Sequence, residues 1–262
     1  MSQLDEATKF IQSSMLFTGK TAIILGSGLG HICENLINKN TLSYEKIPHY
    51  PISTVEGHAG ELVSGNLGGE NVLISNGRFH QYEGFSENDI MFPFKIFKNL
   101  GIKNIITTNS SGSLNKRFPP GTLMAIDEHI DCSFQGNYKD PKRVNGNQYH
   151  SEYLLKLARE VSKTLDIKLE KGTYCWTLGP MYETPAEISY FKTLGGNAVG
   201  MSGVPEIKIC NKLKMEMLTI SNLTNYAAGI SDQILTHEDV ILNANSNKES
   251  LSQLLLGIIK RI

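Results

Sequence analysis

Short apolar runs alternate along this chain with longer stretches in which apolar positions recur at helical spacing. Several of the runs are continuously apolar, which is typical of strands covered on both faces. The runs predict strands at Thr21–Leu25, Asn71–Ser75, Lys103–Thr108, Gly121–Ile126, Gly172–Thr177, Asn197–Met201 and Met215–Ser221. The longer stretches predict helices at about 87–100, 150–165, 185–194, 204–213 and 236–258.

Three of the predicted helices have recognisable starts. Thr184-Pro-Ala-Glu187 combines a Thr cap, Pro at the first helical position and Glu three residues on. Thr236-His-Glu-Asp239 is a weaker version of the same capping box, with Asp in place of Glu. Ser202-Gly-Val-Pro-Glu206 also resembles the start of a helix. The polar segment Gln135–Tyr149 predicts a loop. Because no linker, charge block or repeat divides the sequence, we predict that residues 1–262 form a single α/β domain with a mixed, twisted central β-sheet flanked by helices.

Composition narrows the possible partners. A net charge of −1 indicates no general attraction to nucleic acid or to an anionic membrane, so any anion site must be local. The four cysteines form no CxxC pair, which argues against a zinc site or a redox motif. The sequence has no secretion signal and no apolar run long enough to span a bilayer. We therefore expect a reduced, cytoplasmic protein with no bound metal.

The segment Gly77-Arg-Phe-His-Gln-Tyr-Glu-Gly84 holds the densest candidate chemistry and follows a predicted strand. In an extended chain alternate side chains share a face, so Arg78, His80 and Tyr82 would point the same way, with Glu83 close behind. Such a set suits an oxyanion beside a polyhydroxylated ligand. The alternative, a solvated surface loop, stays open on this segment alone.

Two glycine-rich turns carry weaker signals. Gly26-Ser-Gly-Leu-Gly30 follows the first predicted strand, but the sixth place of the dinucleotide fingerprint is His31, so that pattern fails. The turn offers backbone N–H groups and the Ser27 hydroxyl to an oxyanion, and a plain strand–helix turn is about as likely. His58, in Gly57-His-Ala-Gly60, becomes a functional candidate only if it meets Arg78, His80 and Glu83 in space.

An ordered set of short motifs resembles the trimeric class of purine nucleoside phosphorylase. The set consists of the three segments described above and five more. These are Thr108-Asn-Ser-Ser-Gly112, Gly179-Pro-Met-Tyr-Glu-Thr184, Val199-Gly-Met-Ser202, Val204-Pro-Glu206 and Leu223-Thr-Asn225. The resemblance implies a nucleoside phosphorylase fold and reversible phosphorolysis of purine nucleosides to free base and pentose 1-phosphate. It also implies inorganic phosphate as co-substrate, no metal or organic cofactor, and a homotrimer.

The same resemblance implies roles for individual residues. Phosphate would be bound by Ser27, His58, Arg78, His80, Ser110 and Ser202. His58 and Glu83 resemble the pair that orients phosphate and pentose. The sugar would meet Tyr82, Met201 and His237, and Tyr182 would pack on the purine face.

Glu183 and Asn225 would read the edge of the base. A carboxylate accepts a hydrogen bond from N1–H of a 6-oxopurine, and an amide donates to O6 or N7. Adenine has an unprotonated N1, so an ionised Glu183 should discriminate against it. The expected substrates are therefore inosine, guanosine and their deoxy forms. Asn225 would also stabilise the negative charge of the departing purine, which requires no protein nucleophile.

Several positions depart from the family pattern. The chain reads Ser110-Ser-Gly-Ser113 where the family usually has alanines and glycines, and Gly203 and Trp176 are unusual. The segment that normally carries an aromatic residue into the neighbouring subunit is shortened, and Tyr149 is the candidate to replace it. Two alternatives stay open: a methylthioadenosine phosphorylase-like enzyme, against which Asn225 speaks, and a catalytically quiet purine-binding paralogue.

Overall fold

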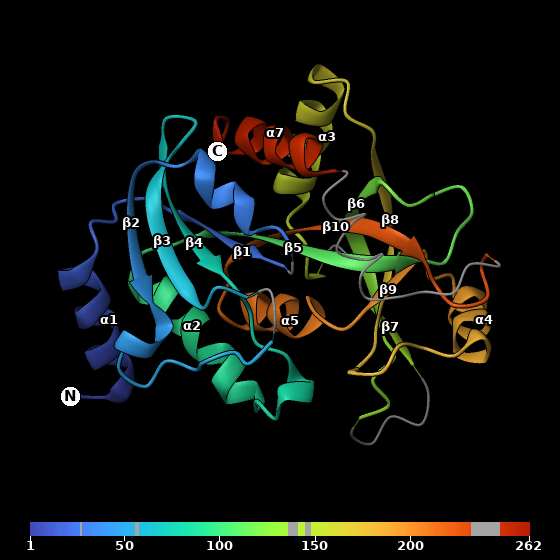
Figure 1. Cartoon of the computed structure of the whole chain (residues 1–262), viewed down its shortest axis with the longest axis horizontal. Coiled ribbons are helices and arrows are strands. Elements are labelled where there is room, and N and C mark those ends of the chain that lie inside the picture. Colours follow the sequence, from blue (N-terminus) through green and yellow to red (C-terminus); the bar gives the residue numbers. More distant parts are fainter. Residues whose placement is uncertain (27, 56–57, 136–140, 145–147, 232–246) are drawn as a thin grey trace.

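The fold is built on one extended β-sheet, seen in a computed structural model that describes the chain except residues 27, 56–57, 136–140, 145–147 and 232–246 (Figure 1). The strands are β1 (Thr21–Leu25), β2 (Ile37–Ser43), β3 (Glu61–Leu67), β4 (Glu70–Asn76), β5 (Asn104–Ser113), β6 (Thr122–Asp131), β7 (Lys142–Val144), β8 (Leu169–Trp176), β9 (Ala198–Gly200) and β10 (Glu216–Tyr226). The helices are α1 (Gln3–Ser14), α2 (Glu87–Asn99), α3 (Glu152–Thr164), α4 (Pro185–Thr193), α5 (Val204–Lys212) and α7 (Lys248–Ile259).

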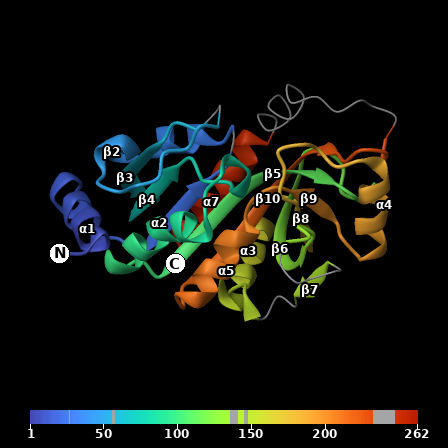
Figure 2. The same ribbon diagram turned by 90° about the horizontal axis from the view of Figure 1, so that it is seen from below.

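The sheet has an open half and a closed half. Its strand order is β10-β6-β8-β9-β5-β1-β4-β3-β2, and β10 also pairs with β5, so strands β5, β10, β6, β8 and β9 form a closed ring of pairings. Parallel pairs join β1 to β4 and β5, and β10 to β5, whereas β9 runs antiparallel to β5. The sheet is therefore mixed, as the sequence predicts. Figure 2 shows α1 beyond the open end of this arrangement and α4 beside the closed end.

Alternating side chains divide the core between the two faces of the open sheet. In β1, Ala22 and Ile24 belong to one buried cluster, while Ile23 and Leu25 belong to another. The first cluster includes buried residues of α1, α2 and α5, and the second includes those of α3 and α7. Figure 1 shows α2 and α5 on one side of the sheet and α3 and α7 on the other. Covering on both faces explains why the strand sequences are continuously apolar.

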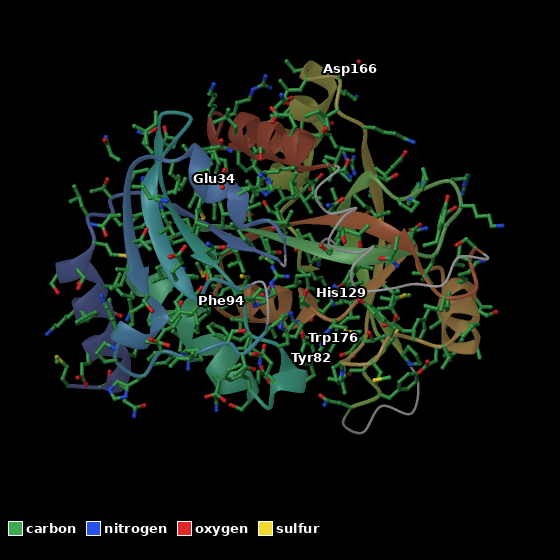
Figure 3. The ribbon with its side chains drawn as sticks, in the orientation of Figure 1. Glu34, Tyr82, Phe94, His129, Asp166 and Trp176 are labelled. Atoms are coloured by element: carbon green, nitrogen blue, oxygen red, sulfur yellow. The ribbon has the colours of Figure 1, made fainter. Side chains whose placement is uncertain are left out.

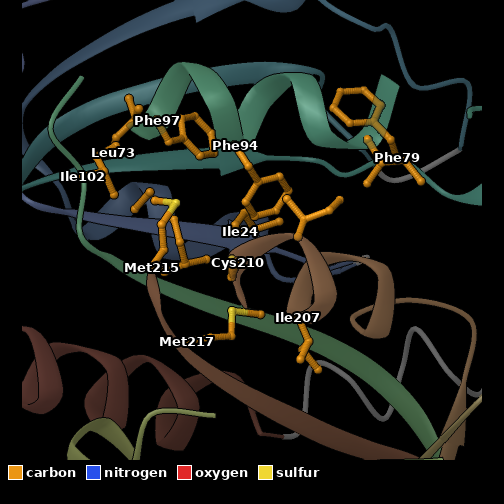
Figure 4. Close-up of a cluster of buried hydrophobic side chains, with 14 of the residues drawn as sticks. Ile24, Leu73, Phe79, Phe94, Phe97, Ile102, Ile207, Cys210, Met215 and Met217 are labelled. Carbon is orange, nitrogen blue, oxygen red and sulfur yellow. The ribbon is translucent and has the colours of Figure 1, made fainter. Parts of the chain in front are cut away.

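Helices α2 and α5 pack together beneath the strand ends that carry the 77–84 segment. Phe94 and Phe97 of α2 lie in one cluster with Ile207 and Cys210 of α5 (Figure 4). Phe79 extends the same cluster, and its ring meets that of Phe85 edge-on at 5.3 Å between centroids. Phe79, which stands between Arg78 and His80, is therefore packed in the core. Its packing holds the backbone of the two polar residues on either side of it.

The strand runs and helix caps of the sequence are largely confirmed. All seven predicted strands are present, and the Thr184 capping box and the Pro205-containing start of α5 form as expected. Strands β5, β6 and β10 extend well past their apolar runs into polar residues. Of the predicted helix 236–258, the described part is α7, and the Thr236–Asp239 box lies outside the described residues.

The sequence pattern does not predict four elements of the structure: α1, β2, β3 and β7. Helix α1 buries only Ala7, Thr8 and Ile11 among charged residues, so its apolar stripe is narrow. The first five residues of β2 are exposed, and β3 contains Gly65 and Asn66, so neither gives a clear apolar run. Strand β7 pairs with β6 inside the segment predicted to be a loop, which corrects that prediction for residues 142–144.

Two buried histidines contact each other at the closed half of the sheet: His129 belongs to β6, and His150 stands just before α3. His129 and His150 are 0% and 5% exposed, and their rings meet at 5.9 Å between centroids. Burial lowers the pKa of His129 to about 4 and that of His150 to about 3. Both side chains therefore stay neutral in the folded protein through the pH range where a histidine in the unfolded chain takes up a proton.

We expect the free energy of unfolding to fall as the pH drops from about 6.5 towards 4. In this pH range His129 and His150 bind protons in the unfolded state but stay unprotonated in the folded state. Each of the two histidines contributes about 1.4 kcal/mol per pH unit to the slope of the unfolding free energy, so the pair contributes roughly 3 kcal/mol per pH unit. Urea denaturation at several pH values measures it. His129→Phe, which keeps the edge-on aromatic contact with Tyr149, should remove about half of the slope that this pair of histidines contributes. An unchanged slope in that variant would contradict the assignment.

Candidate active site

A cavity opens where the ends of strands from both halves of the sheet meet. Its walls come from the carboxyl-terminal parts of β5, β9 and β10 and from residues that follow β1, β4, β8, β9 and β10, the edge where α/β sheets commonly bind ligands. The lining residues are Gly26, Arg78, His80, Tyr82, Asn109, Ser110, Ser111, Gly112, Tyr182, Glu183, Val199, Gly200, Met201, Ser202, Thr224, Asn225 and Ala227.

Most of the site residues predicted from the sequence meet at this cavity. Nine line it: Arg78, His80, Tyr82, Ser110, Tyr182, Glu183, Met201, Ser202 and Asn225. His58 and Glu83 do not line it, but both contact His80. Ser27 and His237 lie outside the described residues.

Arg78 is held as a fixed cation in the wall. Its side chain is 2% exposed, and its two terminal nitrogens donate to Ser202 Oγ at 2.8 Å and to the Thr108 carbonyl oxygen at 2.7 Å. Its Nε lies 3.4 Å from Oε1 of Glu206, which is itself 3% exposed. A buried charge persists when it is paired in this way, and the fork of an arginine suits a phosphate oxyanion.

His58, His80 and Tyr82 form a stack of three rings. The centroids of His58 and His80 are 5.4 Å apart, and those of His80 and Tyr82 are 4.7 Å apart. Figure 3 labels Tyr82 on the segment after β4. Arg78, His80 and Tyr82 therefore do face one volume, as the alternation in the sequence predicts. Tyr82 stays a neutral phenol, because burial and the charge of Glu83 raise its pKa to about 12.

Glu83 is the charged anchor of this stack. Its Oε1 lies 3.0 Å from Nδ1 of His80, and its Oε2 accepts from the Thr54 backbone N–H at 2.8 Å and from Ser53 Oγ at 3.0 Å. Burial raises the pKa of Glu83, but these hydrogen bonds outweigh it and lower the pKa to about 2. Because an ionised carboxylate only accepts, His80 Nδ1 carries a proton, and Nε2 faces away from Glu83.

His58 is a neutral support in this group. Its Nδ1 lies 3.1 Å from the Arg78 carbonyl oxygen and 3.3 Å from Ser53 Oγ. Burial and the charges of His80 and Arg78 lower its pKa to about 4. His58 therefore does lie close to Arg78, His80 and Glu83. This is the condition on which the sequence makes it a functional candidate.

Two further lining residues, Glu183 and Asn225, carry a carboxyl and an amide. Glu183 Oε1 accepts a hydrogen bond from Thr177 Oγ1 at 2.6 Å, and burial raises the pKa of Glu183. The Asn225 amide oxygen accepts from Thr224 Oγ1 at 2.9 Å, and its nitrogen donates to the Tyr226 carbonyl oxygen at 2.9 Å. Both groups are oriented by neighbours before any ligand arrives, and the 45%-exposed ring of Tyr182 lies next to Glu183 in the chain.

Gly179 allows two walls of the cavity to approach each other. Its φ of +74° is in the left-handed region, which favours glycine. A Cβ atom there would lie 2.4 Å from Sδ of Met201 and 3.1 Å from the Tyr82 ring. A side chain at this position would displace Met201. Steric crowding therefore explains why the Gly179–Thr184 motif begins with glycine.

The unusual serines divide between the cavity and the fold. Ser110 and Ser111 both line the cavity, and Ser111 Oγ also lies 2.6 Å from Ser221 Oγ. Ser113 does not line it, and its Oγ donates to the Asn115 carbonyl oxygen at 3.0 Å. The hydroxyl groups of Ser111 and Ser113 are thus used by bonds within the protein. Tyr149, the candidate intersubunit aromatic, packs its ring edge-on against His129 of its own chain, with the centroids 5.3 Å apart.

Some contributing residues have no assignment from the sequence. Thr54, Thr177, Glu206 and Thr224 orient the groups described above, although Glu206 and Thr224 stand within quoted motifs. Thr54 and Thr177 lie outside every motif, and a lone threonine gives no signal by itself. Within the described parts of the chain, no group of three or more His, Cys, Asp or Glu side chains is placed to hold a metal ion, and no helix has both the length and the apolar character to cross a membrane.

Comparisons with known proteins agree with this geometry. The family model described as phosphorylase superfamily matches residues 20–260. Purine nucleoside phosphorylase 1 of Bacillus subtilis (strain 168) is 39% identical over 98% of this chain and 97% of its own length. Solved structures of Schistosoma mansoni purine nucleoside phosphorylase, in complex with inosine and with adenosine, superpose with a TM-score of 0.88 each, at 28% and 29% identity. Each covers 99% of this chain and 96% of the solved one.

The fold and the cavity thus define an α/β enzyme of the phosphorylase superfamily. Within that superfamily the chain belongs to the purine nucleoside phosphorylases, which are pentosyltransferases.

Proposed function

We propose that this enzyme catalyses the reversible phosphorolysis of 6-oxopurine nucleosides, namely inosine, guanosine and their deoxy forms. In this reaction inorganic phosphate attacks C1′ of the pentose as the bond from C1′ to N9 breaks. The bonding electrons leave with the purine, and the products are the free base and (deoxy)ribose 1-phosphate. The chain's own residues position the reactants, and no organic cofactor or metal takes part.

The phosphate site would lie at the Arg78 wall. Arg78, His80, Ser110 and Ser202 supply a cation and polar donors from three different segments, and Ser27 and His58 would complete the set. Hydrogen bonds to a charged group are worth about 1.5–3 kcal/mol each. Because Nδ1 of His80 donates to Glu83, Nε2 would donate to the phosphate when the ring carries both protons, or accept from a phosphate hydroxyl when the ring is neutral.

The sugar would lie between the phosphate and the base, against Tyr82 and Met201, with His237 at its 5′-hydroxyl. Tyr182 would cover the purine face. Glu183 would accept from N1–H, and the second N–H of the Asn225 amide would donate to the purine at O6 or N7. The observation that carries this assignment is that Glu183 and Asn225 both line the cavity and are both already oriented by hydrogen bonds.

Catalysis would follow from charges on opposite sides of the pentose. The transition state of glycosyl transfer resembles an oxocarbenium ion, so the bound phosphate anion stabilises the developing cation at C1′. At the other side, the Asn225 amide stabilises the negative charge that grows on the leaving purine. The serines act as donors only, and His58 and Glu83 orient the phosphate and the pentose.

The assembly and location are also proposals. We propose that residues 1–262 form one domain, which the uninterrupted sheet supports, and that three copies assemble into a homotrimer. A reduced cytoplasmic environment fits the four buried cysteines, all of which are free.

The test is phosphate-dependent release of free base from inosine, guanosine and adenosine. We expect turnover of inosine and guanosine, none without phosphate, and much less with adenosine. Equal or faster turnover of adenosine would favour a methylthioadenosine phosphorylase-like enzyme and overturn the assignment of Glu183 and Asn225. Purine binding without turnover would favour a catalytically quiet paralogue.

A further inference from the structure

Thr177 is the first residue after β8, and it is anchored on two sides. Its backbone N–H donates to the carbonyl oxygen of Gly200 in β9 at 3.0 Å, which fixes the main chain. Its hydroxyl donates to Oε1 of Glu183 at 2.6 Å, and the Thr177 side chain is 9% exposed. A nearly buried hydroxyl on a fixed strand end therefore contacts the carboxyl group that faces the cavity.

We propose that Thr177 is a positioning residue for base recognition: its hydroxyl holds the Glu183 carboxylate as a hydrogen-bond acceptor towards the purine and so contributes to the choice of 6-oxopurines over 6-aminopurines. The proposal rests on the proposed function, in which Glu183 reads the base edge.

The reason is the opposite hydrogen-bonding character of the two forms of Glu183. An ionised carboxylate only accepts and therefore matches N1–H of a 6-oxopurine, whereas a protonated one can donate and would match the unprotonated N1 of adenine. Loss of the ionised form would thus reduce discrimination between the two bases. Whatever favours the carboxylate at this position also favours the 6-oxopurine.

The surroundings of Glu183 make the ionised form difficult to keep. Burial and the charge of Glu187 on α4 both raise its pKa. Among the residues that the structure describes, the other titratable groups that interact with it are Tyr182, Tyr174 of β8 and Cys132, and none of these three is a cation. The Thr177 hydroxyl is a neighbour that acts in the other direction, because a hydrogen bond to the charged form lowers the pKa.

The test compares Thr177→Val, which keeps the β-branched shape and removes the hydroxyl, with Thr177→Ser, which keeps the hydroxyl. For Thr177→Val we expect kcat/KM for inosine to fall about tenfold, mainly through a higher KM. The acid limb of the pH profile should move to higher pH, and the inosine-to-adenosine ratio of kcat/KM should fall. Thr177→Ser should restore the position of the limb and the ratio.

Thr173→Val is a matched control four residues earlier, in β8. The Thr173 hydroxyl donates to Glu128 Oε2 at 3.2 Å and its side chain is 5% exposed, but it does not line the cavity. This variant loses a threonine–glutamate hydrogen bond of the same kind, so it reports the effect of such a loss on the fold alone. We expect it to leave the ratio and the acid limb unchanged.

The outcomes separate this inference from the proposed function. If Thr177→Val keeps the wild-type ratio and acid limb while Glu183→Gln lowers the ratio, positioning by Thr177 is wrong and base reading by Glu183 stands. If Glu183→Gln also leaves the ratio unchanged, Glu183 does not read the base and both proposals fail. Equal shifts in Thr177→Val and Thr173→Val would assign the effect to the fold and overturn the inference.

Discussion

Replacement of Asn225 by alanine is expected to lower kcat for inosine by about 10²–10³-fold, with a smaller change in KM. Removing one donor that stabilises a developing negative charge typically has this effect, because the interaction strengthens in the transition state. The amide is held by Thr224 and by the Tyr226 carbonyl oxygen, so little reorganisation accompanies the reaction in the native enzyme. Steady-state kinetics with saturating phosphate measures the effect.

Two further variants sharpen this result. Thr224→Val keeps the amide but removes the hydroxyl that orients its oxygen, so we expect a smaller loss than in Asn225→Ala. Asn225→Asp replaces the donor by an acceptor, and it should lower inosine turnover while raising the adenosine-to-inosine ratio. A loss below about tenfold in Asn225→Ala, or an equal loss in kcat for all three variants, would show that the amide does not stabilise the leaving purine.

Replacement of Arg78 by alanine should abolish phosphate-dependent turnover and also destabilise the protein by about 3–5 kcal/mol. The loss of stability arises because Glu206, 3% exposed, would be left as a buried charge without its partner. The loss of activity arises because the cation proposed to bind phosphate is gone. Urea denaturation measures the first effect, and initial rates at increasing phosphate concentration measure the second.

The double variant Arg78→Met with Glu206→Gln separates the two effects. It removes both members of the buried pair at similar volume, and replacing a whole buried pair is often neutral for stability. We therefore expect stability near that of the wild-type protein and still no turnover. Recovery of turnover together with stability would mean that Arg78 supports the fold without binding phosphate.

Local signals in the sequence predict much of the fold because their physical causes are local. The apolar runs of the seven strands and the capping box at Thr184 depend on residues within a few positions of one another. By contrast, α1 and β2 bury little apolar surface and leave no such run, so only their packing in the folded chain reveals them. The polar ends of β5 and β10 are strand because they pair with each other, not because of their own residue types.

By itself the sequence determined which chemical groups are available and the order in which they occur, including the alternation that turns Arg78, His80 and Tyr82 to one side. Only the tertiary structure decided their partners: Arg78 with Ser202 and Glu206, His80 with His58, and Glu183 with Thr177. Arg78 and Ser202 are 124 positions apart. Contacts over such separations depend on how the strands pair and close into a ring, and no short stretch of sequence encodes that pairing.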